Sequence, residues 1–293
     1  MTLEQLRIFV AVAEREHMTA AAQAINVTQS AASAAISALE ERHNIKLFHR
    51  VGRGIALTDE GTIFLEEARD VLARAAGAEL VLDEIGGLRR GTLRVVASQT
   101  IAAYWLPPIL AEFRARYPLL GIDLAIGNTA QAAARVHDGE AELGIVEGEV
   151  ENPALAQWRI GEDRLLLVQK DPPVVAVTVK TLLAASWVMR EDGSGTRSTF
   201  DTAMRRIGVD PSEINIALVL PSNESVRTAA EAGAGIAALS ELVVAPALAV
   251  GTLHALPIDL GARPFYGLRH KERYRSRAAD ALLEMIAGAS DAL

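Results

Sequence analysis

The sequence of 293 residues contains no cysteine, and none of its apolar runs approaches the ~18 residues that a membrane span requires. The missing cysteines exclude a disulfide framework, a thiolate zinc site and a thiol nucleophile. The first residues, Met1–Arg7, also lack the charged and then apolar layout of a secretory signal. Together these absences predict a protein of the reducing cytoplasm without a membrane partner.

Positive charge is scarce over the chain as a whole. There are 29 Lys and Arg against 37 Asp and Glu, which gives a net charge of −8. This bulk charge argues against nucleic acid as a partner. Residues 42–58 differ, because they hold four cations and no carboxylate. Half of all residues are apolar, so the chain can form packed cores, and its length predicts two domains.

The first 43 residues have the pattern of three short helices. An apolar stripe of helical period covers residues 3–16, and Thr19 is the expected N-cap of a second helix. Asn26 tolerates the left-handed turn that would follow. Thr28 is the expected cap of a third helix over residues 29–43. This helix would bury Ala32, Ile36 and Leu39 and expose small polar residues on its other face, as in a helix-turn-helix.

Two short extended runs, residues 45–50 and 55–57, surround a pair of glycines. They predict a β-hairpin, which is the wing of a winged helix. The cations of residues 42–58 are concentrated where such a wing meets DNA phosphates. A solvated basic hairpin on an unrelated domain is the alternative.

Thr58 is the expected N-cap of a long helix that begins with Asp59 and Glu60 and ends before Gly86. Apolar residues in this helix step alternately by four and three, which predicts pairing with another helix. They are Phe64, Ala68, Val71, Ala75, Ala78, Leu82 and Ile85. Packing of this stripe against the chain's own core is the alternative. A polar joint around Arg89 and Arg90 then marks the main domain boundary.

From Thr92 onward strands alternate with helices, which predicts a doubly wound parallel sheet. The expected strands are residues 93–97, 122–126, 143–146, 165–168, 187–190, 216–219, 236–239 and 265–269. The expected helices are residues 101–116, 129–138, 179–184, 196–207, 224–232, 242–248 and 275–289. Sheets of this type bind ligands beyond the carboxyl ends of their strands.

Polar residues at the predicted strand ends are the candidate ligand-binding residues. They are Ser98, Gln99, Thr100, Asn128, Thr129, Glu147, Gly193, Ser194, Gly195, Thr196, Arg197 and Asn223. In the loop 193–197, two glycines free the backbone N–H groups, and Ser194, Thr196 and Arg197 add donors beside a helix N-terminus. This chemistry suits a small oxyanion. An ordinary helix cap is the alternative explanation of the loop.

The ordered motifs of the first sixty residues resemble those of the LysR-type transcriptional regulators. They are Leu3-x-x-Leu6-x-x-Phe9, Thr19-Ala20-Ala21-Ala22, Thr28-Gln29-Ser30-Ala31-Ala32-Ser33, Leu39-Glu40, Leu47-Phe48-x-Arg50 and Leu57-Thr58-x-x-Gly61. The Gly-Ser-Gly-Thr-Arg loop is similar to that of a LysR-type subset linked to sulfur assimilation or carbon fixation. The resemblance covers essentially the whole chain.

The resemblance implies an α/β protein with a winged helix-turn-helix over residues 1–58 and a linker helix over 59–90. A two-lobed effector domain over 91–293, like a type 2 periplasmic binding protein, would follow. Its first lobe would comprise residues 91–161 and 266–293, and its second lobe residues 162–265. It further implies homodimers formed by the linker helix and assembled into a homotetramer, with promoter DNA, a small anionic metabolite and RNA polymerase as candidate partners. No cofactor is implied.

The resemblance also assigns residues to DNA. Gln29, Ser30 and Ser33 would face the major groove, Thr28 and Arg50 would contact phosphates, and Arg53 would lie at the tip of the wing. Many relatives carry an arginine after the recognition-helix serine, where this chain has Ala34. Base readout by a bidentate arginine is therefore reduced, and we expect more reliance on groove shape.

Three other classes remain as alternatives. A solute-binding protein would share the two lobes but needs export and no winged helix. A regulator that senses an aromatic or neutral ligand fits the same fold. For an enzyme, no catalytic constellation is found: the six histidines are scattered, and there is no Gly-x-Ser-x-Gly elbow. No carboxylate and histidine cluster has the spacing of a metal site.

Overall fold

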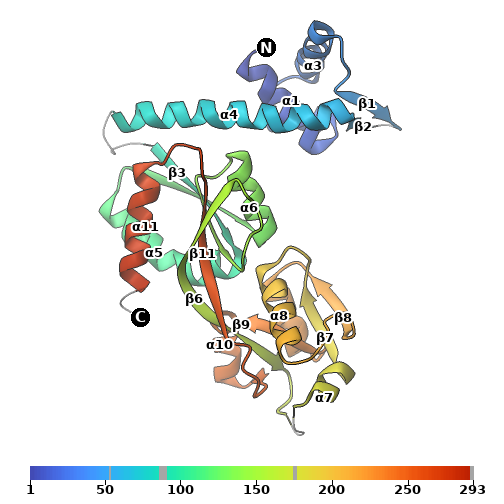
Figure 1. The fold of residues 1–293 in the computed structure, drawn as a ribbon, viewed down its shortest axis with the longest axis vertical. Helices are drawn as coiled ribbons and strands as arrows, with labels where there is room; N and C mark the ends of the chain where they lie inside the picture. Colours follow the sequence, from blue (N-terminus) through green and yellow to red (C-terminus); the bar gives the residue numbers. More distant parts are fainter. Residues whose placement is uncertain (53, 86–90, 174–176, 291–293) are drawn as a thin grey trace. The chain divides into compact units, whose positions relative to one another are not determined.

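The structure is a computed structural model that describes residues 1–52, 54–85, 91–173 and 177–290 (Figure 1). It forms two compact units, one of Met1–Leu82 with Asp138–Glu140 and one of Asp83–His137 with Ala141–Leu293. No helix in the described ranges is long and apolar enough to cross a membrane. Each unit has its own hydrophobic core.

The first unit is a winged helix-turn-helix. Helices α1 (Leu3–Arg15), α2 (Met18–Ala24) and α3 (Gln29–His43) precede strands β1 (Phe48–Val51) and β2 (Gly54–Leu57), which pair antiparallel as the wing. The helices bury a common core that includes the predicted Ala32, Ile36 and Leu39. The three helices and the hairpin of the sequence prediction are therefore confirmed.

One predicted cap was wrong. The second helix begins at Met18, and the ring Nδ1 of His17 accepts a hydrogen bond from the N–H of Ala20 at 3.2 Å. Thr19 therefore lies inside the first turn, where it cannot act as the cap. The other two local predictions hold: Asn26 has a left-handed φ of 56°, and the Thr28 hydroxyl accepts from the N–H of Ala31.

A buried carboxylate fixes the wing to α3. Glu40 is 7% exposed, and its two oxygens accept hydrogen bonds from Lys46 Nζ at 2.5 Å and from the N–H groups of Leu47 and Phe48 at 2.9 and 3.3 Å. Burial acts to raise the pKa of Glu40, but these donors outweigh it and hold the pKa below its ordinary value. One of the four cations of residues 42–58 is thus engaged within the protein.

Helix α4 (Asp59–Ile85) divides its apolar stripe between two environments. The Thr58 hydroxyl caps the helix by accepting from the N–H of Gly61. Phe64 and Ala68 pack into the core of the winged helix, as the alternative interpretation expected. Further along the stripe, Val71 and Leu82 are 40% and 70% exposed.

The second unit consists of two lobes. The first contains β3 (Gly91–Ser98), the π-helical turn η1 (Ile101–Trp105), α5 (Leu106–Arg116), β4 (Leu120–Gly127), α6 (Thr129–Asp138), β5 (Leu143–Glu147) and α11 (Arg277–Ser290). The second contains α7 (Val179–Ala184), β7 (Ser186–Arg190), α8 (Gly195–Arg206), β8 (Asn215–Leu220), α9 (Asn223–Glu231), β9 (Ile236–Ser240), α10 (Glu241–Val250) and β10 (His254–Ala255).

The predicted helix over residues 101–116 is interrupted at its start. Residues 101–105 form a π-helical turn in which the N–H of Leu106 bonds to the carbonyl of Ile101, and α5 follows with Pro107 and Pro108 in its first turn. Prolines carry no N–H, so the regular bonds to the carbonyls of Ala103 and Tyr104 cannot form. The widened turn lies directly after the strand end at Ser98.

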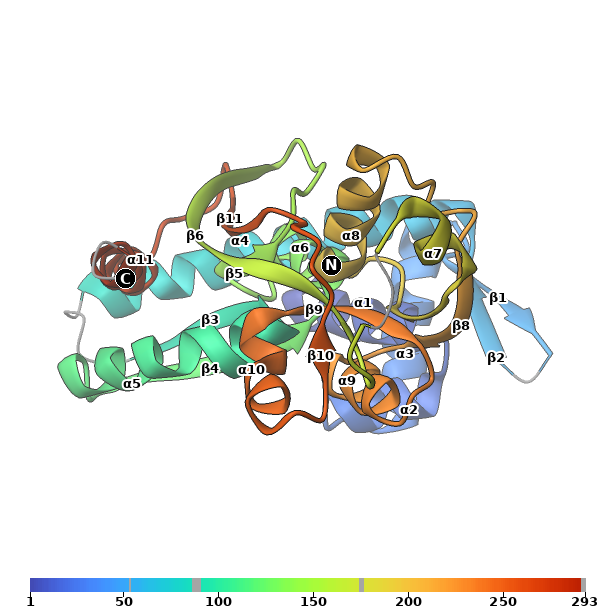
Figure 2. The same ribbon diagram turned by 90° about the horizontal axis from the view of Figure 1, so that it is seen from below.

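Two long strands, β6 (Leu155–Gln169) and β11 (Ala262–His270), carry the chain between the lobes. They pair antiparallel side by side, as both views show (Figures 1 and 2). The strand order is β4-β3-β5-β11-β6-β9-β7-β8, with parallel pairs within each lobe. The predicted parallel pairing is therefore found within each lobe, and the two connecting strands run antiparallel to their neighbours.

We expect Glu40→Ala to lower the free energy of unfolding of the winged helix by about 1–3 kcal/mol, because the buried N–H of Leu47 and the partly buried N–H of Phe48 lose their acceptor. Urea denaturation measures the loss, with the exposed Glu41→Ala as the matched control. Since the pKa of Glu40 is lower in the folded state, its contribution is present above the unfolded value of 4.5 and is lost as the pH falls through the folded value. If the difference in free energy of unfolding between Glu40→Ala and wild type stays the same in acid, this explanation is wrong.

Candidate functional site

Buried polar side chains gather where the strands of both lobes end. Each of them is less than 8% exposed. Polar and charged side chains are mostly exposed in proteins unless they are paired. They are Ser98, Thr100, Thr129, Glu147, Arg190, Ser194, Thr196, Asn223, Ser240 and Arg263. We call this set the interlobe network. Seven of its members were predicted from the sequence as ligand-binding residues, and Arg190, Ser240 and Arg263 were not.

Hydrogen bonds from Gln99 and Thr100 join the first lobe to the start of α9. Gln99 donates from Nε2 to the carbonyl of Pro221 at 2.9 Å, and its Oε1 accepts from the N–H of Asn223 at 3.0 Å. The amide of Asn223 donates to the Thr100 hydroxyl at 3.0 Å. Beside them, the Tyr104 hydroxyl donates to Glu224 at 3.1 Å. Three predicted residues therefore hold the lobes together directly.

Arg190 lies at the end of β7 with a side chain that is 3% exposed. Its guanidinium binds both oxygens of Glu191, at 2.8 and 2.9 Å, and donates to Asn223 Oδ1 at 2.5 Å. From the first lobe, Asn128 Nδ2 donates to the same Glu191 carboxylate at 3.2 Å. Burial acts to raise the pKa of Glu191, but Arg190 outweighs it and lowers the pKa below its ordinary value.

The loop 193–197 meets the first lobe through glycine. A side chain at Gly195 would place its Cβ 2.2 Å from the carbonyl oxygen of Glu147 and 2.5 Å from the hydroxyl of Thr129, so only glycine fits. Gly193 has a φ of +82°, and its carbonyl accepts from the N–H of Ala130 at 3.1 Å. The loop is therefore held by backbone contacts to the first lobe.

Arg263 on β11 is completely buried and connects both lobes to both connecting strands. It forms a two-pronged ion pair with Asp163 of β6, at 2.6 and 2.5 Å, and donates to the Thr196 hydroxyl at 3.0 Å. Glu147 lies 3.7 Å away. Burial disfavours the charge, but Glu147 and Asp163 raise the pKa of Arg263, which stays protonated.

Two buried polar atoms of the network have no hydrogen-bond partner in the described structure, the Ser98 hydroxyl and Glu147 Oε1. Both residues stand at the carboxyl ends of β3 and β5, which are neighbouring parallel strands. An unsatisfied buried polar group costs free energy unless a ligand or water meets it. The network can therefore accept additional hydrogen bonds at this edge of the sheet.

Arg197 meets the interlobe network through a backbone contact, because its Nη1 donates to the carbonyl oxygen of Arg190 at 3.4 Å. Its Nε donates to Asp201 at 3.1 Å, one turn along α8, and it lines a cavity of about 490 Å³. Thr129, Gly193 and Ser194 line the same cavity, together with the carboxylates of Glu149 and Glu151. Of the sequence-predicted residues, Arg197 is thus the one whose charge is already matched by a neighbour on its own helix.

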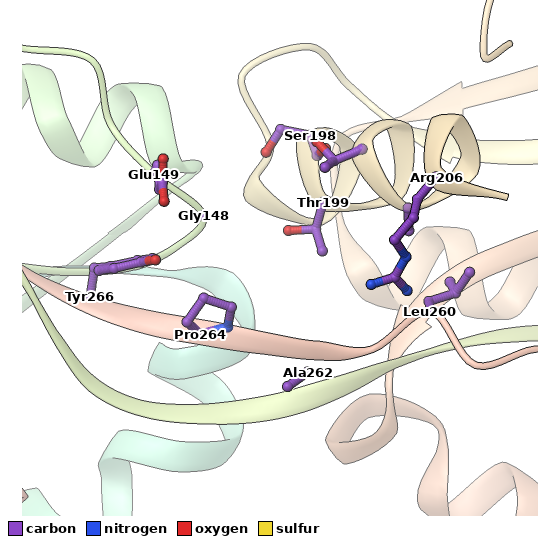
Figure 3. A pocket seen from close by; sticks show the side chains of 11 residues that line it. Gly148, Glu149, Ser198, Thr199, Arg206, Leu260, Ala262, Pro264 and Tyr266 are labelled. Carbon is purple, nitrogen blue, oxygen red and sulfur yellow. The ribbon is translucent and has the colours of Figure 1, made fainter. Parts of the chain in front are cut away.

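A second cavity, of about 400 Å³, lies beside β11, and none of the sequence-predicted residues lines it (Figure 3). Glu149 and Tyr266 stand at one end, and Arg206 at the other, near Leu260. Thr199 points into the space between them. Burial and the neighbouring Glu149 raise the pKa of Tyr266.

In the first unit, a groove joins the start of α3 to the wing. Gln29 and Ser33 of α3, Arg50 of β1 and His17 before α2 line it, with a volume of about 440 Å³. Gln29, Ser30 and Arg50 are exposed, and the Thr28 hydroxyl lies 3.0 Å from that of Ser30. Arg53 lies outside the described residues. Four of the six residues predicted to face DNA are therefore exposed, while Ser33 is half-buried in the groove.

Two family models match this chain. The model described as "Bacterial regulatory helix-turn-helix protein, lysR family" covers residues 3–62, and the model of the "LysR substrate binding domain" covers residues 86–291. The chain therefore belongs to the LysR family of transcriptional regulators. It is a DNA-binding regulator with an effector domain and not an enzyme.

Curated relatives agree with this assignment. The chain is 31% identical over 289 residues to the "Uncharacterized HTH-type transcriptional regulator YeiE" of Escherichia coli (strain K12), with 97% of this chain and 96% of that protein covered. It is 30% identical over 294 residues to the "Probable RuBisCO transcriptional regulator" of Nostoc sp. (strain PCC 7120), with 97% and 87% covered.

Solved structures show the same fold. The LysR family regulator CbnR superposes with a TM-score of 0.70 at 20% identity and 99% coverage of both chains. The regulatory domain of CcmR from Synechocystis PCC6803, solved in complex with 2-PG, matches with a TM-score of 0.62 at 26% identity. It covers 69% of this chain and 98% of that one.

Proposed function

We propose that this regulator senses a small metabolite carrying an oxyanion, a sulfur oxyanion or a phosphorylated compound, bound in the interlobe network. The convergence of buried donors from both lobes at the strand ends carries this proposal. The residues assigned to the effector are Ser98, Gln99, Thr100, Asn128, Thr129, Glu147, Gly193, Ser194, Gly195, Thr196, Arg197 and Asn223, and the structure adds Arg190. The single guanidinium of Arg190 is enough to bind one oxyanion.

The donors suit an oxyanion for two reasons. Arg190 offers a planar guanidinium that binds carboxylate or phosphate through two parallel hydrogen bonds. Helices α8 and α9 both begin at the network, so their N-terminal N–H groups and dipoles favour negative charge there. At the first of these helices, Ser194 makes no hydrogen bond as a side-chain cap, which leaves N–H groups of the first turn without that partner.

The names of similar proteins support an anion linked to carbon fixation. A relative at 30% identity is named as a probable RuBisCO regulator, and the CcmR domain was solved with 2-PG. The Gly-Ser-Gly-Thr-Arg loop of residues 193–197 resembles that of the same subset of the family. The name of the relative YeiE specifies no effector. It therefore does not exclude a sulfur oxyanion, which stays within the proposal.

We infer that binding acts through a shift of population between lobe arrangements. The hydrogen bonds of Gln99 and Asn223 across the lobes must form or break as the lobes move, so a ligand that favours one arrangement changes the equilibrium. In a homodimer paired by the exposed part of α4, this movement would change the spacing of two winged helices on promoter DNA. Exposed Ile126 and Val219, on the two edge strands β4 and β8, would offer separate apolar contacts for a tetramer. RNA polymerase would be contacted from the DNA-bound assembly.

We expect a selective rise in melting temperature with one class of anion from a panel of sulfate, sulfite, thiosulfate, phosphosugars and phosphoenolpyruvate. At about 100 times the dissociation constant the stabilisation is roughly 2.7 kcal/mol. The shift in melting temperature should be lost in Arg190→Gln, because this variant lacks the guanidinium that takes part in the network. Arg197→Gln tests the neighbouring cavity. If the rise in melting temperature is lost in this variant alone, the anion binds in that cavity instead. A response to neutral or aromatic compounds alone would refute the oxyanion.

For DNA, the proposal assigns Thr28, Gln29, Ser30, Ser33, Arg50 and Arg53. We expect Arg50→Ala to weaken binding uniformly across DNA sequences and to reduce the slope of log K against log salt by about 1, as loss of one phosphate contact requires. Fluorescence anisotropy at several salt concentrations measures this slope. Arg116→Ala, in the second unit, is the matched control. An unaltered slope would show that Arg50 does not reach the phosphates.

A further inference from the structure

Glu191 holds a position that an effector anion would need. Its two carboxylate oxygens bind the guanidinium of Arg190 at 2.8 and 2.9 Å, and one of them also accepts from Asn128 of the other lobe at 3.2 Å. The donors that converge on this carboxylate are three N–H groups from two lobes. A carboxylate or phosphate ligand would be recognised by the same three donors.

The two partners of this pair differ in their freedom to move. The Arg190 side chain is 3% exposed and is also held by its bond to Asn223 Oδ1. The Glu191 side chain is 26% exposed and begins the loop that leads to Gly193, after β7 has ended. A change of rotamer can therefore carry the Glu191 carboxylate into water, while Arg190 has to stay in the network.

Charge balance points the same way. Arg263 is already matched by Asp163 and lies near Glu147, so it has no charge to offer a further anion. Arg197 is matched by Asp201. Arg190 is likewise matched, by Glu191, whose side chain is 26% exposed, against 22% for Asp201 and 5% for Asp163. The Arg190 pair differs from the Arg197 pair because its carboxylate also accepts a hydrogen bond from Asn128 of the other lobe. An incoming anion would restore the neutrality that Glu191 had provided.

We propose that Glu191 is a specificity-determining residue that occupies the anion position of the ligand-free network as a built-in carboxylate, so that the effector binds by displacing it. This inference rests on the proposed function and extends it to the class of ligand. The effector presents two oxygens in the geometry of a carboxylate or a phosphate, because it replaces a carboxylate bound through both of its oxygens. Glu191 also sets the concentration at which the regulator responds.

The size of the effect follows from this competition. If the arrangement in which Glu191 has left Arg190 is populated to about 10%, the apparent affinity for an anion is lowered about tenfold. Removing the carboxylate should restore that factor. The expected gain in Glu191→Gln is therefore about tenfold or more in the dissociation constant.

The test titrates the full chain with inorganic sulfate and, separately, inorganic phosphate by calorimetry. Wild type is compared with Glu191→Gln and with Asp192→Asn, which removes the same charge from the exposed neighbouring residue. Glu191→Ala is a second variant that vacates the position without adding an amide. Circular dichroism melts of each variant establish that it is folded.

We expect one of the two anions to bind both Glu191 variants at least about tenfold more tightly than wild type, with Asp192→Asn within about twofold. Equal or weaker binding in folded Glu191 variants, while wild type binds, would overturn the role of Glu191 and leave the oxyanion site standing. An equal gain in affinity in Asp192→Asn would also overturn it, since removal of any nearby negative charge would then explain the result. Binding by no variant at all would refute the oxyanion site itself.

Discussion

The buried ion pair between Arg263 and Asp163 is the interaction on which the second unit depends. It joins the two strands that connect the lobes, at a point where both side chains are almost completely withdrawn from water. Removal of one partner from such a pair leaves an uncompensated charge and costs about 3–5 kcal/mol. The pair therefore fixes the two connecting strands to each other, while the hydrogen bonds of Gln99 with the backbone of Pro221 and Asn223 are neutral and cost less to break.

The winged helix solves a different electrostatic problem. The chain is acidic overall, with a net charge of −8, yet its DNA-binding surface needs cations. Glu40 is an acidic residue in this region that does not oppose DNA, because its carboxylate is buried against Lys46 and the N–H groups of the wing. Arg50 is exposed beside Gln29 in the groove. The ion pair of Glu40 with Lys46 thus orients the wing, and Arg50 is left exposed to solvent.

Local patterns were sufficient to predict most of the elements, and long-range pairing was not. Residues 129–138 and 179–184 are helices with the predicted bounds, because capping and apolar spacing define both. The first half of β6 was missed, since Arg159, Glu162 and Asp163 look solvated until β11 pairs with them. The strand-end rule located Ser98 and Asn223, whereas Arg190, Glu191 and Arg263 were missed. An arginine in a strand reads as exposed from sequence, and only the tertiary contacts show it buried.

We propose that an oxyanion bound between the lobes changes their arrangement. Because the natural chain has no cysteine, a single pair of introduced cysteines can carry spin labels without background. Exposed Glu112 on α5 and Lys180 on α7 place one label on each lobe. We expect the distribution of distances between the labels to shift when the anion that stabilises the protein most is added to saturation. An unchanged distribution under saturating anion would contradict this proposal.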